Sequence, residues 1–263
     1  MKTIVLFDMD GTLTEPRREI DEDLLRPLKE LSRKAEIGIL TGSDINYVQQ
    51  QLSVLISDKT IRCKVHLLPC NGTKHLIPPQ NIDGEYELVY KSEMRRILDD
   101  SSYRELMLIL FKQQLDIGYL NVPLSGHFFN YRGSMINWCP IGRDASPVDR
   151  ARFIDYDTSF KPSLREKQLS RIKHYFSLRG LSSELTCALG GDTSIDIYPI
   201  GWDKTFAMRH FRDYDVWFVG DRCEDNGNDK TIYDLLKKKN RSFKTTGPKE
   251  TKKIINVLIN EIK

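Results

Sequence analysis

Two aspartates that are two residues apart, Asp8 and Asp10, follow a short apolar segment near the start of the chain. Positions i and i+2 of an extended segment project to the same side, so the two carboxylates would converge. One member of such a pair can serve as an ionised nucleophile or metal ligand while the other exchanges protons. Gly11 would allow a tight turn whose amide N–H groups face an anion. The segment therefore predicts a site that binds an anion. The alternative is a loop in which the two acids only cap a turn.

The residues around this pair indicate a strand, a helix and a second strand. Residues 3–7 are continuous, β-branched and apolar, which is typical of a strand buried on both faces of a parallel sheet. Asp21 is placed to cap a helix over 21–34, in which Pro27 predicts a late start or a kink. Residues 37–40 suggest the second strand. Such a βαβ unit predicts a parallel sheet, whose carboxyl-end edge is where open α/β sheets bind ligands.

The end of the chain repeats this pattern, with a strand over 216–219 and helices over 228–239 and 249–262. The middle of the chain differs. Helical patterns lie there beside short segments in which apolar and polar residues alternate, and this mixture favours an α+β insertion. These patterns cover residues 92–114 and 163–178 for the helices and 135–140 and 194–199 for the strands.

Proline and glycine punctuate the chain at 78–80 and 199–201, and we place the domain boundaries there. The predicted fold class is α/β. A parallel-sheet core domain comprises residues 1–80 and 202–263, and an inserted α+β cap domain comprises residues 81–201.

The composition excludes several classes of protein. Hydrophobic residues make up 40% of the 263 residues and charged residues 29%, which excludes a disordered or fibrous chain. The net charge of +3 is too small to indicate a nucleic-acid partner, and the longest apolar run, Leu106–Phe111, is too short to span a membrane. We expect no signal peptide. The five cysteines form no C-x-x-C pair and indicate free thiols in a reducing cytoplasm.

The segment from Phe7 to Thr14 resembles the nucleophile motif of the haloacid dehalogenase superfamily of phosphoryl-transfer enzymes. Further segments resemble, in the same order, those of the eukaryotic-type phosphomannomutases within it. They are TGSD (41–44), NGT (71–73), RGSMINWCPIGR (132–143), Arg150, GGDTSIDIYPIGWDK (190–204) and GDRCEDNGND (220–229). The first motif alone points only to the superfamily, whereas the segments at 132–143 and 190–204 are much more specific.

This resemblance implies roles for residues of the core domain. Asp8 would attack the phosphoryl group and become an aspartyl-phosphate, and Asp10 would protonate the departing sugar oxygen. Magnesium would bind the Asp8 carboxylate, the Asp10 main-chain carbonyl and Asp221, because a carboxylate and a phosphate dianion repel each other without a cation. Lys204 would add positive charge beside Asp8.

The resemblance also implies a second group of residues, which holds the other phosphate and the sugar hydroxyls. Guanidinium groups suit this task because they bind phosphate bidentately and stay charged. The implied residues are Arg132, Arg143, Arg150, Ser194 and Asp196 in the cap domain and Arg17 in the core domain.

Three features depart from the family pattern or leave a choice open. The segment 41–43 usually begins with glycine in phosphomannomutases, so either Thr41 or Ser43 would contact the transferring phosphate. Asp192-Thr193 replaces a more apolar pair. Asp229 is favoured over Asp225 as the acid that supports the metal site.

The resemblance finally implies an isomerase that interconverts mannose 6-phosphate and mannose 1-phosphate for GDP-mannose biosynthesis. Hexose 1,6-bisphosphate would be its activator, and the protein would be a cytoplasmic homodimer that associates through the cap domain. A sugar-phosphate phosphatase would need no new residues, but the arginine set favours the mutase. A non-catalytic binding module is the third reading, against which the intact Asp8, Asp10 and Asp221 speak.

Overall fold

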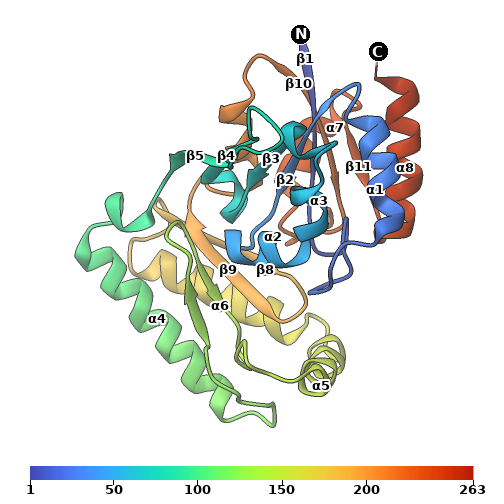
Figure 1. Cartoon of the computed structure of the whole chain (residues 1–263). Coiled ribbons are helices and arrows are strands. Elements are labelled where there is room, and N and C mark those ends of the chain that lie inside the picture. Colours follow the sequence, from blue (N-terminus) through green and yellow to red (C-terminus); the bar gives the residue numbers. More distant parts are fainter. Residues whose placement is uncertain (263) are drawn as a thin grey trace. The chain divides into compact units, whose positions relative to one another are not determined.

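The computed structural model describes residues 1–262, and the chain divides into two compact units (Figure 1). The core unit comprises residues 1–91 and the chain from Asp203 onward, and the inserted unit comprises residues 92–202. The first boundary therefore lies later than the sequence indicated. Residues 81–91 remain in the core unit because strand β5 (Glu87–Lys91) pairs with β4 (Lys74–Ile77).

A seven-stranded sheet forms the centre of the core unit, in the order β11-β10-β1-β2-β3-β4-β5. The first five strands in this order run parallel, and β4 and β5 are antiparallel to their neighbours, so the predicted parallel-sheet core is confirmed. The parallel strands are β1 (Lys2–Phe7), β2 (Glu36–Leu40), β3 (Val65–Leu68), β10 (Tyr214–Gly220) and β11 (Ser242–Lys244).

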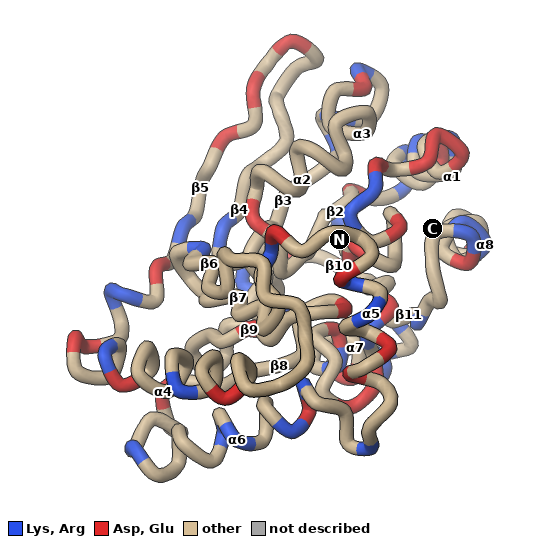
Figure 2. Tube along the Cα trace, turned by 90° about the horizontal axis from the view of Figure 1, so that it is seen from below, with Lys and Arg blue, Asp and Glu red and all other residues tan. Residues whose placement is uncertain are grey.

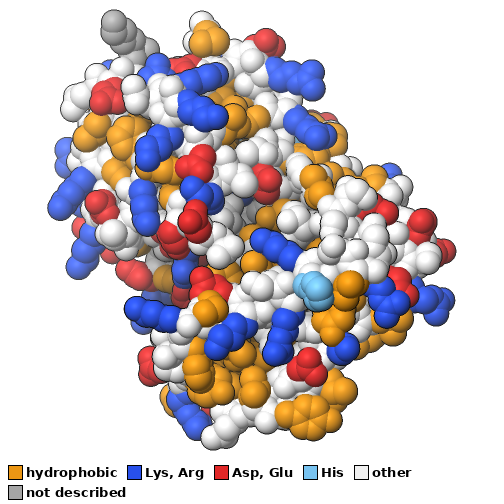
Figure 3. Space-filling view, turned by 180° about the vertical axis from the view of Figure 1, so that it is seen from behind, with side chains coloured by type: hydrophobic (Ala, Val, Ile, Leu, Met, Phe, Trp, Pro, Cys, Tyr) orange, Lys and Arg blue, Asp and Glu red, His pale blue; other side chains and the backbone are white. Residues whose placement is uncertain are grey.

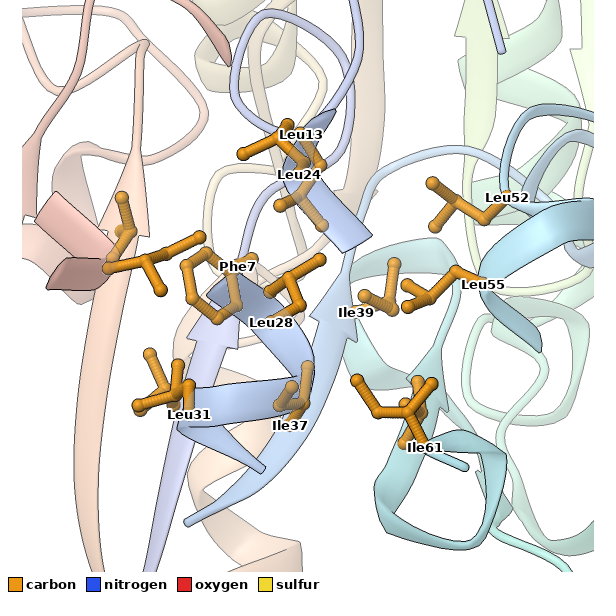
Figure 4. Close-up of a cluster of buried hydrophobic side chains, with 14 of the residues drawn as sticks. Phe7, Leu13, Leu24, Leu28, Leu31, Ile37, Ile39, Leu52, Leu55 and Ile61 are labelled. Carbon is orange, nitrogen blue, oxygen red and sulfur yellow. The ribbon is translucent and has the colours of Figure 1, made fainter. Parts of the chain in front are cut away.

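Alternate residues of the central strand β1 contact helices on opposite faces of this sheet. Val5 and Phe7 belong to one apolar cluster, and Figure 4 shows Phe7 beside Leu28 within it. Ile4 and Leu6 belong to the other cluster, which α7 completes. Burial on both faces explains the uninterrupted apolar sequence of β1. The helices are α1 (Glu22–Leu31), α2 (Ile45–Gln51), α3 (Ser53–Ser57), α7 (Lys230–Lys237) and α8 (Pro248–Glu261).

Helix α1 begins where the sequence predicted its cap. The Asp21 side chain accepts a hydrogen bond from the Asp23 N–H at 2.9 Å. Pro27 lies inside the helix, so the predicted late start is wrong. The buried leucines of this helix, Leu24 and Leu28 among them, stabilise it by more than the one hydrogen bond that a proline removes.

The inserted unit contains an antiparallel sheet in the order β6-β7-β9-β8 and three helices. The predicted first helix starts later than residue 92, because Asp99 caps it and accepts a hydrogen bond from the Ser102 N–H at 2.7 Å. Helix α5 was not predicted, since its sequence lacks an apolar period. The elements are α4 (Asp100–Gly118), β6 (Phe129–Tyr131), β7 (Ile136–Trp138), α5 (Pro147–Thr158), α6 (Leu164–Leu178), β8 (Leu185–Gly190) and β9 (Ser194–Pro199).

Charges of both signs are distributed over the helices, and Figure 2 shows acidic and basic residues together along α1 and α4. None of the helices in residues 1–262 is both long enough and apolar enough to cross a membrane. All five cysteines are free thiols, and four of them are buried.

Two buried histidines form a chain of close polar contacts with Glu36 in the core unit. His75 Nε2 lies 3.0 Å from His66 Nδ1, and His66 Nε2 lies 3.0 Å from Glu36 Oε2. Burial, together with the positive charges of the neighbouring His210 and His66, lowers the pKa of His75 from 6.5 to about 3. The unfolded chain therefore binds a proton between about pH 6.5 and pH 3 that the folded chain does not.

We expect the free energy of unfolding to fall as the pH falls through this window. The His75→Gln variant should lose part of this dependence, because glutamine keeps an N–H donor but does not titrate. Denaturant unfolding at a series of pH values measures the slope. His174→Gln, on the exposed face of α6, is the control, and equal slopes for His75→Gln and the wild type would contradict the assignment.

Candidate active site

Three neighbouring parallel strands end at the same edge of the core sheet and bring distant residues together. Strands β10, β1 and β2 are adjacent, and they are followed directly by Asp221, Asp8 and Thr41. The carboxyl-end edge of a parallel sheet is the usual ligand position in this class of fold. The sheet order thus explains why residues more than two hundred positions apart meet.

Lys204 is fully buried and lies between two carboxylates. Its Nζ donates to Asp8 Oδ1 and, at 2.5 Å, to Asp229 Oδ1. Asp203 begins the 3₁₀ helix η4 (Lys204–His210) by accepting a hydrogen bond from the Thr205 N–H at 2.8 Å, and this cap sets where Lys204 points. Burial acts to lower the pKa of Lys204, but Asp229 and Asp8 outweigh it and raise that pKa.

Three carboxylates, those of Asp8, Asp221 and Asp229, offer oxygens that lie within 4.8 Å of one another. Lys204 and the Arg222 guanidinium, whose Nε lies 3.5 Å from Asp221 Oδ2, are two cations for three acids. Burial raises the pKa of Asp8 strongly and that of Asp221 to about 6. Asp221 Oδ1 is buried without a hydrogen-bond partner among the described residues. An all-oxygen, electron-rich set of this kind fits a hard divalent cation such as Mg²⁺.

Gly11 makes room for this acidic group. A Cβ at this position would lie 2.3 Å from Asp221 Oδ2, and the φ of +81° is itself unfavourable for other residues. The prediction of a tight turn after Asp10 thus has a second cause, which is the close approach of Asp221.

The two candidates for the supporting acid have different environments. Asp229 is fully buried and accepts hydrogen bonds from Lys204 and from the Arg222 N–H at 3.0 Å. The Asp225 side chain is 93% exposed and pairs with Lys230 at 3.5 Å. Asp229 therefore belongs to the cluster, and Asp225 does not.

Asp10 lies beside the loop that follows β2. Its Oδ1 accepts a hydrogen bond from the Arg17 N–H at 3.0 Å, and its Oδ2 lies 3.5 Å from the Ser43 hydroxyl. The Thr41 hydroxyl accepts from the Ser43 N–H at 3.1 Å and holds that turn. Ser43 is thus the hydroxyl that faces Asp10. Arg17 has a left-handed backbone, with a φ of 63°, and an exposed side chain.

Gln51, at the end of α2, is a residue of this site that the sequence did not indicate. One end of its buried amide faces the Arg18 carbonyl oxygen at 3.2 Å, Thr14 Oγ1 at 3.0 Å and Asp10 Oδ1 at 3.1 Å. Carbonyl and carboxylate oxygens only accept, so this end is the NH₂ group. Gln51 therefore supports the Asp10 carboxylate.

In the inserted unit, Asn137 joins two of the predicted residues, and a third contacts one of these two. It accepts a hydrogen bond from Arg143 Nη1 at 2.6 Å and donates to Asp196 Oδ1 at 2.7 Å. Arg132 Nη1 lies 4.0 Å from the same Asp196 oxygen. Asn137 lies opposite Asp196 in the β7–β9 ladder, a register that sequence spacing alone does not reveal.

Arg150 and Ser194 lie close to this group along the chain. Arg150 Nη2 donates to the Arg143 carbonyl oxygen at 2.9 Å, and Nη1 donates to Thr193 Oγ1 at 2.8 Å. Ser194 donates to the Gly190 carbonyl oxygen at 2.7 Å. Four of the five predicted residues of the inserted unit thus lie in β9 or beside β7, and the fifth, Arg150, lies in the first turn of α5.

The sequence of the chain matches one protein family over most of its length. Residues 24–261 match the model of the eukaryotic phosphomannomutase family. The chain belongs to this family.

Curated members of the family are similar over nearly the whole chain. Phosphomannomutase 1 of Dictyostelium discoideum is 33% identical over 260 residues, which cover 97% of this chain and 96% of that protein. The phosphomannomutase of Nicotiana benthamiana is 31% identical over 252 residues, which cover 95% and 91%. These alignments extend beyond the family model toward the amino terminus.

Solved structures share the fold at lower identity. A Plasmodium falciparum IMP-nucleotidase superposes with a TM-score of 0.70 at 15% identity, over 98% of this chain and 68% of that one. The trehalose-6-phosphate phosphatase of Aspergillus fumigatus gives a TM-score of 0.53 at 17% identity, over 98% and 93%. They confirm the predicted haloacid dehalogenase-like fold.

Proposed function

We propose that this protein catalyses the magnesium-dependent interconversion of mannose 6-phosphate and mannose 1-phosphate. The observation that carries the proposal is the buried Lys204 between Asp8 and Asp229, in a chain of the phosphomannomutase family. A buried lysine beside a strand-end aspartate suits attack on an anion, because its charge offsets that of both reactants.

In the proposed reaction, a carboxylate oxygen of Asp8 attacks phosphorus and the bond from phosphorus to the sugar oxygen breaks. Asp10 gives its proton to the departing oxygen. It then takes a proton from the hydroxyl that attacks the aspartyl-phosphate in the second half-reaction. Gln51 and the Arg17 N–H hold Asp10 for this exchange.

We assign the metal to the carboxylates of Asp8, Asp221 and Asp229 and the main-chain carbonyl of Asp10. Bound magnesium would supply positive charge that lets a carboxylate approach a phosphate dianion. Asp229 also holds Lys204 in place. The Ser43 and Thr41 hydroxyls and Lys204 would bind the transferring phosphate.

The inserted unit would hold the other end of the substrate. Arg132, Arg143 and Arg150 would bind the phosphate that is not being transferred, Ser194 would contact phosphate, and Asp196 a sugar hydroxyl. Arg17 would assist from the core unit. A mutase must accept its bisphosphate intermediate in two orientations, and a set of guanidinium groups serves both, since each presents several N–H donors. Hexose 1,6-bisphosphate would therefore act as the activator.

A coupled assay tests this function. Mannose 1-phosphate and magnesium are supplied with and without hexose 1,6-bisphosphate, and both mannose 6-phosphate and free phosphate are recorded. Mannose 6-phosphate that forms only with the activator would support the mutase. Free phosphate without isomerised sugar would instead identify a sugar-phosphate phosphatase.

We also propose that two copies associate through the inserted unit. Leu108, Phe111 and Leu115 lie at helical spacing on one face of α4 and are 53%, 53% and 60% exposed. Phe111 stacks edge-on against Phe129 of the edge strand β6, at 5.5 Å between ring centroids. Figure 3 shows apolar side chains among charged ones on the surface. An apolar stripe beside a sheet edge suits a second copy of the same surface.

Light scattering tests this association. The double variant Phe111→Asp/Leu115→Asp should lower the mass from dimer to monomer, because four aspartates would face one another in the interface. Val257→Asp, on the exposed face of α8, is the control and should remain dimeric. A monomeric wild type would contradict the proposal.

For the cell, we propose a cytoplasmic enzyme that supplies mannose 1-phosphate for GDP-mannose biosynthesis. The five free thiols support a reducing compartment.

A further inference from the structure

The turn between β8 and β9 carries a hydroxyl that the proposed mechanism does not use. Thr193 directly precedes Ser194, the first residue of β9. Its side chain is only 5% exposed. A buried hydroxyl is unfavourable unless it is hydrogen-bonded, so its partners indicate its role.

The Thr193 hydroxyl accepts from two donors on other segments. Arg150 Nη1, in the first turn of α5, donates to Oγ1 at 2.8 Å. The buried Cys139 thiol, directly after β7, lies 3.6 Å from the same oxygen. Thr193 thus ties the β8–β9 turn to the end of β7 and to the start of α5.

Main-chain carbonyls hold the rest of the Arg150 guanidinium. Nε donates to the Ala145 oxygen at 3.2 Å, and Nη2 donates to the Arg143 oxygen at 2.9 Å. Each nitrogen therefore uses one N–H, and the guanidinium has five in all. One N–H remains on Nη1 and one on Nη2. One N–H from each of the two terminal nitrogens is what bidentate binding of a phosphate requires.

We infer that Thr193 is a positioning residue for Arg150, and that its hydroxyl fixes the guanidinium so that Nη1 and Nη2 each present one N–H to a phosphate. The inference rests on the proposed function, in which Arg150 binds the phosphate that is not being transferred. Without the hydroxyl, Nη1 loses its only acceptor among the described residues, and the guanidinium is then held on its Nε and Nη2 side alone.

Kinetics of Thr193→Val and Thr193→Ser test this role with mannose 1-phosphate as substrate. Valine removes the hydroxyl at nearly constant shape, and KM should rise about 3- to 10-fold with little change in kcat. Serine restores the acceptor and should restore KM. Thr158→Val is the control, because that exposed hydroxyl bonds only to carbonyls of its own helix. An unchanged KM for Thr193→Val, or no rescue by serine, would overturn the inference.

A double-variant cycle separates positioning from general packing. In the Arg150→Ala background, Thr193→Val should have no further effect on KM, because the residue through which Thr193 acts is gone. Independent effects of the two substitutions would overturn the inference.

A nuclear magnetic resonance measurement tests whether Thr193 positions the Arg150 guanidinium, and it requires no enzymatic activity. The ¹⁵N-bound side-chain protons of Arg150, identified by their loss in Arg150→Ala, should report faster guanidinium rotation in Thr193→Val than in the wild type. Equal rotation would overturn the role of Thr193. A wild type that lacks mutase activity would refute the proposed function, while this comparison would still decide how Arg150 is held.

Discussion

Asp8→Asn should abolish turnover while the protein stays folded. An asparagine amide is not a useful nucleophile towards phosphorus, so we expect kcat to fall by at least about 10⁴-fold, the scale of a lost nucleophile. Stability should not fall, because the substitution removes a buried charge whose pKa is already raised by burial, and Lys204 keeps Asp229 as its partner. The coupled assay and a melting curve measure the two effects.

Asp225→Asn is the matched control for this experiment. It makes the same chemical change four residues after Asp221, on an exposed side chain outside the carboxylate cluster. It should keep wild-type turnover. Substantial turnover in Asp8→Asn would show that another group attacks phosphorus, and loss of turnover in Asp225→Asn would return that residue to the list of candidate acids.

Lys204→Met should be the most destabilising of the site substitutions. Methionine keeps the length of the side chain but removes the cation that Asp8 and Asp229 share in a fully buried position. Removal of one partner from a buried ion pair typically costs about 3–5 kcal/mol. We expect a loss of this size in denaturant unfolding at neutral pH, together with loss of turnover.

The measurement should be made with a metal chelator, so that no divalent cation replaces the lysine. Addition of Asp8→Asn to Lys204→Met should recover part of the stability, since one unpaired buried carboxylate is then removed. Lys59→Met is the control, because Lys59 forms an exposed ion pair with Asp83 that contributes about 0–1 kcal/mol. Equal losses for the two lysine variants would refute the buried-pair assignment.

The part of the site at Asp8 was predictable from local sequence. The apolar run Ile4–Phe7, followed by Asp8-Met9-Asp10-Gly11, has few structural solutions other than a buried strand that ends in a polar turn. The α/β fold class and the strand that precedes Asp221 were predicted from the same pattern, in which short apolar strands alternate with helices. Lys204 and Asp229 came only from family resemblance, because nothing in their spacing reveals that β10 pairs with β1.

The residues that sequence reasoning missed share one property. Gln51 and Asn137 were not singled out, and Thr193 was noted only as a departure from the family pattern; all three are neutral polar side chains, which occur at many positions without a special role. Each is buried, and its role becomes visible only from its hydrogen-bond partner on another segment of the chain. Helix α5 was not predicted for a related reason. Phe153 and Asp157 are its only buried residues, and because Asp157 is an acid, the sequence shows no apolar period there.

The split construction of the core unit has a consequence for the order in which the protein acquires activity during its synthesis. Strand β1 emerges early from the ribosome, but its neighbour β10 is translated after the whole inserted unit. The antiparallel sheet of the inserted unit pairs only with itself and can form first. Asp8 therefore gains its neighbours Lys204 and Asp221 only when the last quarter of the chain is made, and under the proposed mechanism a nascent chain is inactive until then.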